Sequence, residues 1–202
     1  MFRNCYSRNV GRPKEFVRDV VLDRAMRVFW SRGYEATSIQ ALVDRMGIQR
    51  GSLYGAFKDK RGLFLAAVEH YNRVESARLL AALEDPTAGK DAIRRFFRMK
   101  VELTRVAGRP RGCLVTNTVA EFAFGDRRTG ARVGAALARL EAAFHRAVVR
   151  AQRAGEIDAR RNARALARFL TSSAQGLSVM AKSRSDRAVL DDIVETTLTA
   201  LE

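Results

Sequence analysis

The sequence is poor in the residues that build disulfide frameworks, metal sites and enzyme centres. Its 202 residues include two cysteines, Cys5 and Cys113, and two histidines, His70 and His145. Cys5 lies in a polar N-terminal stretch, so an internal disulfide is not expected and a reducing, cytoplasmic setting fits. The histidines are isolated, and no CxxC or HExxH spacing occurs. We therefore predict neither an enzyme nor a bound metal or cofactor.

Long apolar runs, prolines and strand patterns are also scarce. No run approaches the ~18 apolar residues of a membrane-spanning helix, and the N-terminus lacks a signal-peptide core. Three prolines, Pro13, Pro86 and Pro110, leave long stretches rich in Ala, Leu and Arg, which favour helix over sheet. Because no strand alternation or hairpin signal occurs and 47% of the residues are hydrophobic, we expect an all-α protein with a substantial core.

What the sequence has in excess is positive charge. The formal net charge is +15 at pH 7, which indicates a polyanionic partner, either nucleic acid or a membrane surface. The charge is denser in residues 1–60 than in the rest of the chain, but it is not confined to them. Charge alone therefore supports nucleic-acid binding only weakly.

The most informative stretch is TSIQALVDRMGIQRGSLYGAFKDKRGLF, from Thr37 to Phe64. Thr37 or Ser38 can cap a first short helix through its hydroxyl, and Gly47 stands where a left-handed residue would end it. The apolar residues of this helix recur at helical spacing; they are Ile39, Leu42, Val43 and Met46.

A second short helix is predicted from Gln49 to Phe57, with Leu53 and Phe57 facing inward. Small, polar and cationic residues are left on its outer side, namely Gln49, Arg50, Ser52, Gly55 and Ala56. A helix held from behind with such a face in front can lie in a DNA major groove. The alternative is a helical hairpin buried in a bundle, where this polar side would be hard to place.

The chain before this stretch is a basic arm followed by one helix. Residues 1–13 are polar, and Arg12 and Lys14 stand just ahead of a helix expected from Glu15 to Ser31. Such an arm can reach a phosphate backbone or a minor groove; a merely solvated tail is the alternative. The three helices together form a helix-turn-helix arrangement.

The rest of the chain predicts six further helices, about nine in all. The fourth, from Lys60 to Leu83, is too long for the first unit to cover, so it should connect that unit to a second domain. The remaining helices are expected near residues 91–106, 113–124, 128–153, 163–182 and 186–201. The last two have broad apolar faces, so we expect a homodimer through them, with a monomeric bundle as the alternative.

At this point the chain resembles the TetR/AcrR family of bacterial transcriptional regulators, specifically over residues 12–65. The resemblance is carried by Thr37-Ser38-Ile39, Gly47-Ile48, Gly51-Ser52-Leu53-Tyr54, Phe57, Lys60 and Leu63-Phe64. It implies a basic arm (1–13), a helix-turn-helix DNA-binding domain (14–60) and a helical ligand-binding and dimerisation domain (61–202).

The resemblance also implies which residues contact DNA: Ser38, Gln49, Arg50, Ser52, Tyr54 and Lys60. Arg50 is the best candidate for a bidentate guanine contact, and Gly51 permits close backbone approach. Tyr54 and Lys60 can pair with phosphates. Many members have histidine where this chain has Ala56 and serine or threonine where it has Gln49, so base preference does not carry over.

In this family the C-terminal helices form a pocket whose ligand releases DNA. The residues expected to line it are Phe64, Val68, Tyr71, Phe97, Val101, Cys113, Thr116, Asn117, Glu121, Phe122 and Phe144. An apolar cavity with a few polar groups suits a small organic ligand. The alternative is that these side chains are plain core.

Cys113 has a second predicted role. It begins an apolar helix, where a thiol pKa is lowered, and Arg109, Arg111 and Lys182 are possible cationic neighbours. A thiolate sensing electrophiles or oxidants is one interpretation, and a plain buried cysteine is the other.

The sequence therefore predicts a homodimeric regulator, more specifically a repressor, that leaves a near-palindromic double-stranded operator when a small organic effector binds or Cys113 is modified. The alternative is a basic helical adaptor that binds protein or membrane rather than specific DNA.

Overall fold

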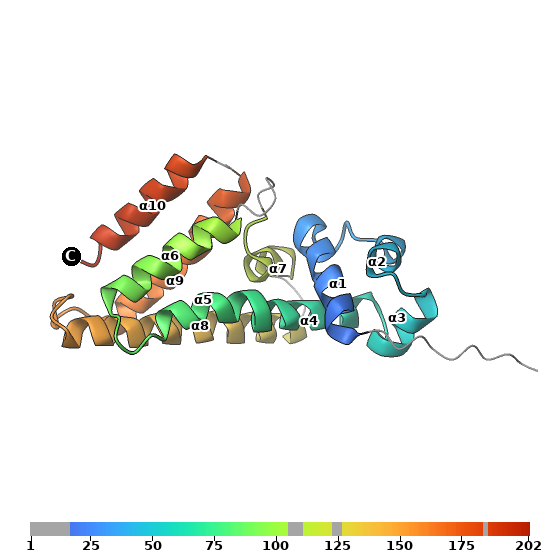
Figure 1. The fold of residues 1–202 in the computed structure, drawn as a ribbon, viewed down its shortest axis with the longest axis horizontal. Coiled ribbons are helices and arrows are strands. Elements are labelled where there is room, and N and C mark those ends of the chain that lie inside the picture. The colour runs from blue at the N-terminus through green and yellow to red at the C-terminus, as the bar shows by residue number, and fades with distance from the viewer. Residues whose placement is uncertain (1–16, 105–110, 123–126, 184–185) are drawn as a thin grey trace, which may run out of the picture.

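The computed structural model describes residues 17–104, 111–122, 127–183 and 186–202, and all of their regular secondary structure is helical (Figure 1). The first helices are α1 (Arg18–Arg32), α2 (Ile39–Met46), α3 (Arg50–Phe57) and α4 (Lys60–Tyr71). They are followed by the π-helical segment η1 (Asn72–Ser76), α5 (Ala77–Leu83), α6 (Lys90–Thr104) and α7 (Leu114–Phe122). The last three helices are α8 (Arg127–Arg153), α9 (Ala163–Ser183) and α10 (Arg187–Thr199).

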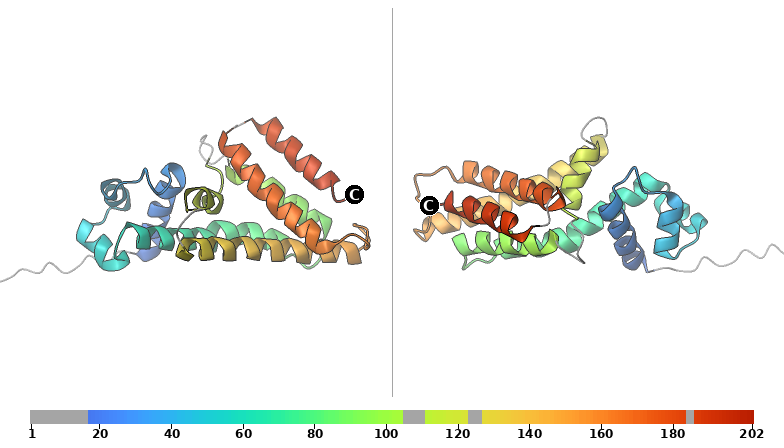
Figure 2. Two further views of the ribbon diagram at one scale, coloured as in Figure 1. Left: turned by 180° about the vertical axis from the view of Figure 1, so that it is seen from behind. Right: turned by 90° about the horizontal axis from the view of Figure 1, so that it is seen from above.

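The molecule is elongated, with α1, α2 and α3 gathered at one end (Figures 1 and 2). The segments α4, η1 and α5 run without a break from residue 60 to residue 83 and leave that end beside α8. Counted as one helix, they give nine helices in the described residues, as the sequence predicts. The π turn at Asn72–Ser76 is a local widening that the sequence does not signal.

Local sequence explains how α2 begins and ends. The Ser38 hydroxyl oxygen accepts a hydrogen bond from Ala41 N at 3.1 Å, so of the two predicted candidates, Thr37 and Ser38, it is Ser38 that caps the helix. Gly47 adopts the left-handed conformation at φ 70° and donates its N–H to Val43 O. Arg24 donates to Met46 O at 3.0 Å, which ties the end of α2 to α1.

The buried apolar residues form two clusters. The first joins α1, α2, α3 and α4 to the start of α7, and its centre is aromatic: Phe64 makes ring contacts with Phe29, Tyr34 and Phe122 at centroid distances of 5.0–5.3 Å. The second joins α5, α6, α8, α9 and α10 around Phe96, Phe97 and Phe144. The first cluster therefore links the helix-turn-helix to the larger helical part.

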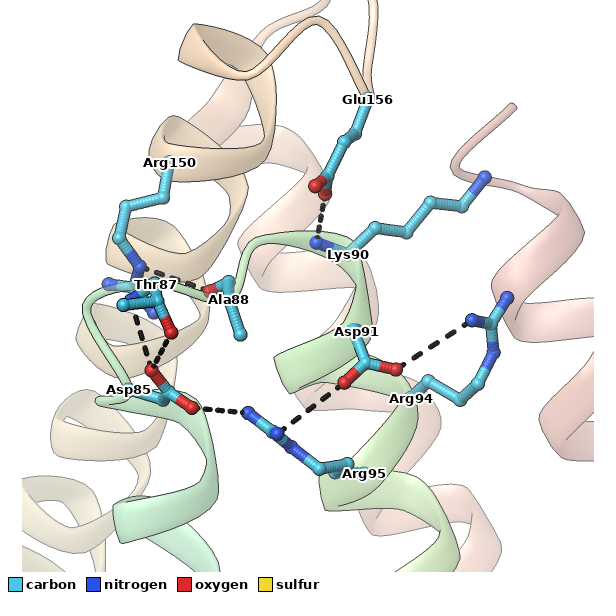
Figure 3. A network of polar contacts seen from close by, with 9 residues as sticks. All are labelled: Asp85, Thr87, Ala88, Lys90, Asp91, Arg94, Arg95, Arg150 and Glu156. Atoms are coloured by element: carbon cyan, nitrogen blue, oxygen red, sulfur yellow. Dashed lines mark hydrogen bonds and ion pairs between the residues drawn. The ribbon is translucent and has the colours of Figure 1, made fainter.

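The turn between α5 and α6 is fixed by polar contacts (Figure 3). Asp85 accepts from the Thr87 N–H and hydroxyl at 2.9 and 2.7 Å and pairs with Arg95 at 2.8 Å. These contacts lower the pKa of Asp85 to about 2, the Thr87 hydrogen bonds being the largest cause. Arg150 of α8 donates to Leu83 O and Ala88 O, so α8 holds both sides of the turn.

No described helix is long and apolar enough to cross a membrane.

Candidate DNA interface and effector cavity

The helix α3 packs against the core on one side and is exposed to solvent on the other. Leu53 and Phe57 are buried, with exposed fractions of 0% and 5%, as predicted from their four-residue spacing. Gln49, Arg50 and Tyr54 are exposed on the other side. A Cβ placed on Gly51 or Gly55 would meet no atom within 4 Å, so solvent borders α3 at both glycines.

The side chains on this face suit contact with a duplex. The Arg50 guanidinium lies 5.9 Å from the centroid of the Tyr54 ring, which steadies it without consuming its donors in an ion pair. Gln49 is the residue before α3 and makes no capping bond with its side chain, so its amide is available. Ser52 is half-buried beside them. This side of α3 has the size and donors to read a major groove.

The other predicted DNA contacts lie at the edges of this face. The Ser38 oxygen is engaged in capping α2, although the side chain remains exposed. The Lys60 ammonium lies over the Tyr34 ring at 4.3 Å from its centroid and donates to Glu35 O at 3.4 Å. Arg12 and Lys14 lie outside the described residues. All of these assignments remain predictions.

The connection from α3 to α4 is unusually tight. Lys58 has φ 70° and ψ −52°, and Asp59 N donates across it to Phe57 O at 2.9 Å, which makes a γ-turn. Asp59 then caps α4 by accepting from Gly62 N at 2.6 Å. A Cβ on Gly62 would lie 2.0 Å from Phe57 O, so only glycine permits this approach. The connection between α3 and α4 is therefore short and closely packed.

A cavity of about 560 Å³ lies between the α4–α5 helix, α6, α7 and α8. This volume is in the usual range for small-molecule sites. The buried apolar residues of its wall are Val68, Tyr71, Leu79, Phe96 and Val115. Charged residues that are exposed border it as well; they are Glu69, Arg73, Arg132 and Arg139.

Several side chains that line this cavity carry polar groups, and Lys100, Cys113 and the hydroxyl of Tyr71 are the three that interact with one another. The Tyr71 hydroxyl donates to Cys113 Sγ at 3.5 Å. Burial alone raises the pKa of the Cys113 thiol, but Lys100 and hydrogen bonds from Tyr71 and Thr116 outweigh it and lower that pKa. Burial lowers the pKa of Lys100, and the Cys113 charge partly opposes this.

Of the eleven predicted ligand residues, Val68, Tyr71 and Cys113 line the cavity. Phe64 and Phe122 stack on each other in the first cluster, and Phe97, Val101 and Phe144 fill the second. Helical periodicity marks every buried side chain alike, so it does not separate core from cavity wall.

The polar candidates of α7 are engaged elsewhere. The Thr116 hydroxyl donates to Gln175 Oε1. Asn117 donates to Arg111 O at 3.2 Å and accepts from Lys182, and Glu121 accepts from Tyr34 N at 2.8 Å. Whether any of the eleven contacts a ligand remains a prediction.

Lys100 is the cavity residue that sequence reasoning missed. It is 4% exposed on α6, between the buried Phe97 and Val101. The sequence did contain a sign of this role, because a lysine within an otherwise apolar helix face is costly to bury.

The helix α7 and the segment just before it join the cavity to the helix-turn-helix at two points. Next to Cys113, Gly112 O accepts a buried hydrogen bond from Trp30 Nε1 at 3.2 Å. Near the other end of α7, Glu121 accepts from Tyr34 N, just after α1. A shift of α7 would thus pull on both the last turn of α1 and the segment that follows it.

Within the described ranges, no group of three or more His, Cys, Asp or Glu side chains is placed to hold a metal ion.

Comparisons with known proteins agree with this geometry. The family model for bacterial regulatory proteins of the tetR family matches residues 21–67, and the model for the tetracyclin repressor-like C-terminal domain matches residues 89–197. These matches leave the predicted boundary between residues 60 and 61 untested.

Similar proteins cover nearly the whole chain. The HTH-type transcriptional regulator YezE of Bacillus subtilis is 37% identical over 194 residues, which are 96% of this chain and 100% of that protein. The HTH-type transcriptional repressor ComR of Escherichia coli is 31% identical, covering 96% of this chain and 93% of ComR.

A solved structure has the same fold. It is a cysteine mutant of the TetR family regulator CifR in complex with 26-bp double-strand operator DNA. The two chains align with a TM-score of 0.82 and 34% identity over 95% of this chain and 100% of that one. The helix-turn-helix, the larger helical part and the matches to both family models agree, and this chain therefore belongs to the tetR family of bacterial regulatory proteins.

Proposed function

We propose that the protein is a homodimeric transcriptional repressor that binds a near-palindromic operator in the cytoplasm and leaves it when its cavity is occupied. The observation that carries the proposal is the open face of α3, with Arg50 and Tyr54 exposed over the buried Leu53 and Phe57. A helix presented in this way is the reading element of helix-turn-helix proteins. The operator complex of the similar CifR supports it.

The proposed dimer uses the last two helices. On α9, Ala165, Phe169, Ser172, Gly176 and Val179 recur at three- and four-residue spacing and are all exposed. Phe169 and Val179 have exposed fractions of 42% and 55%. Small and apolar residues in one stripe allow the α9 helix of a second copy to approach closely. In the same chain, α10 packs beside α9. Two copies would hold two α3 helices at the spacing that successive major grooves require.

The proposed release passes through α7 and α4. A molecule in the cavity touches Val68 on α4 and Val115 on α7. The turn after α3 lies closely against α4 at Gly62, and α7 is bonded to Tyr34, while Gly112 just before α7 is bonded to Trp30. The effector must bind better to a dimer with wrongly spaced α3 helices, because equal affinity for both states shifts nothing.

The test of DNA binding is a mobility shift with the DNA upstream of the gene and with a scrambled duplex of equal length. We expect a shift that prefers the natural sequence. Equal shifts of both duplexes, or salt-insensitive capture of a protein without a DNA footprint, would favour a basic adaptor instead.

We also propose Cys113 as a site where modification releases the operator. The thiol is half-buried in the cavity wall and its pKa is lowered, which favours the reactive thiolate. In a Cys5→Ser background, iodoacetamide should release the operator, and Cys113→Ser should abolish that release. Release that persists in the double variant would end the sensor idea.

A further inference from the structure

The cavity contains one buried charge. Lys100 is 4% exposed and faces the cavity, whereas the other charged side chains that line it are exposed. The walls around Lys100 are apolar and include Phe96 and Leu79. In such surroundings an ammonium group loses most of its hydration and gains little in return.

Within the described part of the chain, Lys100 forms no ion pair with a carboxylate and no hydrogen bond through Nζ, and its side chain borders the open space of the cavity. The ionisable group that influences Lys100 is the Cys113 thiol. That thiol already accepts a hydrogen bond from Tyr71. A buried cation is unfavourable unless a group of opposite charge lies beside it, and buried charges in folded proteins are ordinarily paired in this way.

We propose that the cavity binds an apolar carboxylate, whose carboxylate group pairs with Lys100 and whose hydrocarbon part lies against Val68, Leu79 and Phe96. The inference rests on the proposed effector site and names the chemical class of its ligand. A single buried cation among apolar walls balances one negative charge. A phosphate dianion would need more buried donors, and an amine would be repelled.

The charges outside the cavity agree with this assignment. Arg73, Arg132 and Arg139 border it; Arg73 is paired with Asp19 at 3.3 Å and Arg132 with Glu69 at 3.2 Å. Among the described residues Arg139 forms no ion pair, so its charge attracts an anion from solution, where such exposed charges act mainly on the association rate. Selection for the carboxylate would then occur at Lys100.

The test is calorimetric titration of the full-length protein with two probe pairs. Each pair is a carboxylate and its neutral amide: decanoate with decanamide, and naphthalene-2-carboxylate with naphthalene-2-carboxamide. We expect at least one carboxylate to bind roughly tenfold or more tightly than its amide. In Lys100→Met that carboxylate should lose roughly 30-fold or more in affinity, because a buried charge is left unpaired.

Arg139→Met is the matched control, since it removes an exposed cation from the same cavity and should change affinity by less than about threefold. Lys100→Gln is a second neutral variant, and both Lys100 variants should melt no lower than the parent because each removes an unpaired buried charge. Equal affinity for carboxylate and amide, failure of both carboxylates to bind, or unchanged affinity in both Lys100 variants would overturn the inference.

Operator mobility shifts on the same samples separate this inference from the proposed function. Operator binding without carboxylate binding overturns the ligand class alone. Carboxylate binding without operator release overturns the effector role while leaving the carboxylate site intact.

Discussion

The reading helix and the cavity are built on opposite physical rules. The helix α3 is eight contiguous residues whose function depends on what they leave exposed, with two side chains buried to hold it. The cavity is drawn from residues between 68 and 175 on several helices, and its function depends on what is enclosed. A local pattern is sufficient for the first and insufficient for the second.

The two sites also use positive charge differently. Arg50 is exposed and rests on the Tyr54 ring, so it can meet a phosphate or guanine with little change in hydration. Lys100 is enclosed, so in the proposed ligand site its charge would require a partner of opposite sign. The protein's high net charge therefore includes cations in very different surroundings, which composition does not distinguish.

The largest expected effect comes from removing the aromatic side chain at the centre of the first cluster, which joins the two regions. Phe64→Ala deletes a side chain that is 1% exposed and touches three rings, so the free energy of unfolding should fall by about 3–5 kcal/mol. Urea denaturation measures it. Val20→Ala, at a position 47% exposed on α1, is the control and should change stability by less than about 0.5 kcal/mol.

The reading face is tested by Arg50→Ala. Specific operator binding should weaken by about 1–3 kcal/mol while the melting temperature is unchanged, because Arg50 is exposed and supports no core. Competition with mutated operators would show relaxed preference at one base pair. An unaltered preference would remove Arg50 as a base reader.

The link between the regions is tested by Glu121→Ala. Removing the carboxylate that accepts from Tyr34 N should lower the free energy of unfolding by about 1 kcal/mol. Glu195→Ala, on the exposed side of α10, serves as the control. Equal denaturation midpoints for the two variants would show that α7 is not held to the helix-turn-helix through this bond.

A substitution in the turn that follows α3 is expected to increase the stability of the fold. Lys58 has a positive φ that glycine adopts without strain, so Lys58→Gly should stabilise the fold by roughly 0.5–1 kcal/mol. Thermal unfolding measures it, with Lys58→Ala as the variant that removes the same side chain but keeps the strain. If the alanine variant gained as much, backbone strain would not be the cause.

The smallest expected effect concerns pH. The pKa of Asp85 is about 2 in the fold and near 4 in an unfolded chain. Its contribution is therefore present above pH 4 and is lost as pH falls through about 2. Acid unfolding of Asp85→Asn should lack that part of the parent's pH dependence, and identical pH profiles for the two proteins would contradict the role given to Asp85.

The sequence predicted the bounds of α2 and the exposed side of α3 well, because these features depend on residues that are near neighbours in the chain. Ser38 and Gly47 mark the start and the end of α2 through hydrogen bonds within a single helical turn. The four-residue spacing of Leu53 and Phe57 fixes which side of α3 is buried. The continuous helix from residue 60 to residue 83 also follows from its pattern.

The cavity could be predicted only in outline. Val68, Tyr71 and Cys113 line it, whereas the rings of Phe97 and Phe144 share their periodicity and fill the core instead. Which apolar residue borders empty space depends on how helices distant in sequence pack together.

The sequence by itself determined the all-α fold, the two bounds of α2 and the exposed face of α3, because hydrogen bonds and periodicity within a few residues decide them. Tertiary structure alone decided that Lys100 and Cys113 share a cavity, that α7 and the segment just before it are bonded to Tyr34 and Trp30, and that Gly62 lies against Phe57 O. Apart from the close approach of Gly62 to Phe57 O, these contacts join residues that are 13 or more positions apart in the sequence. Their positions depend on close packing of whole helices, which no local pattern specifies.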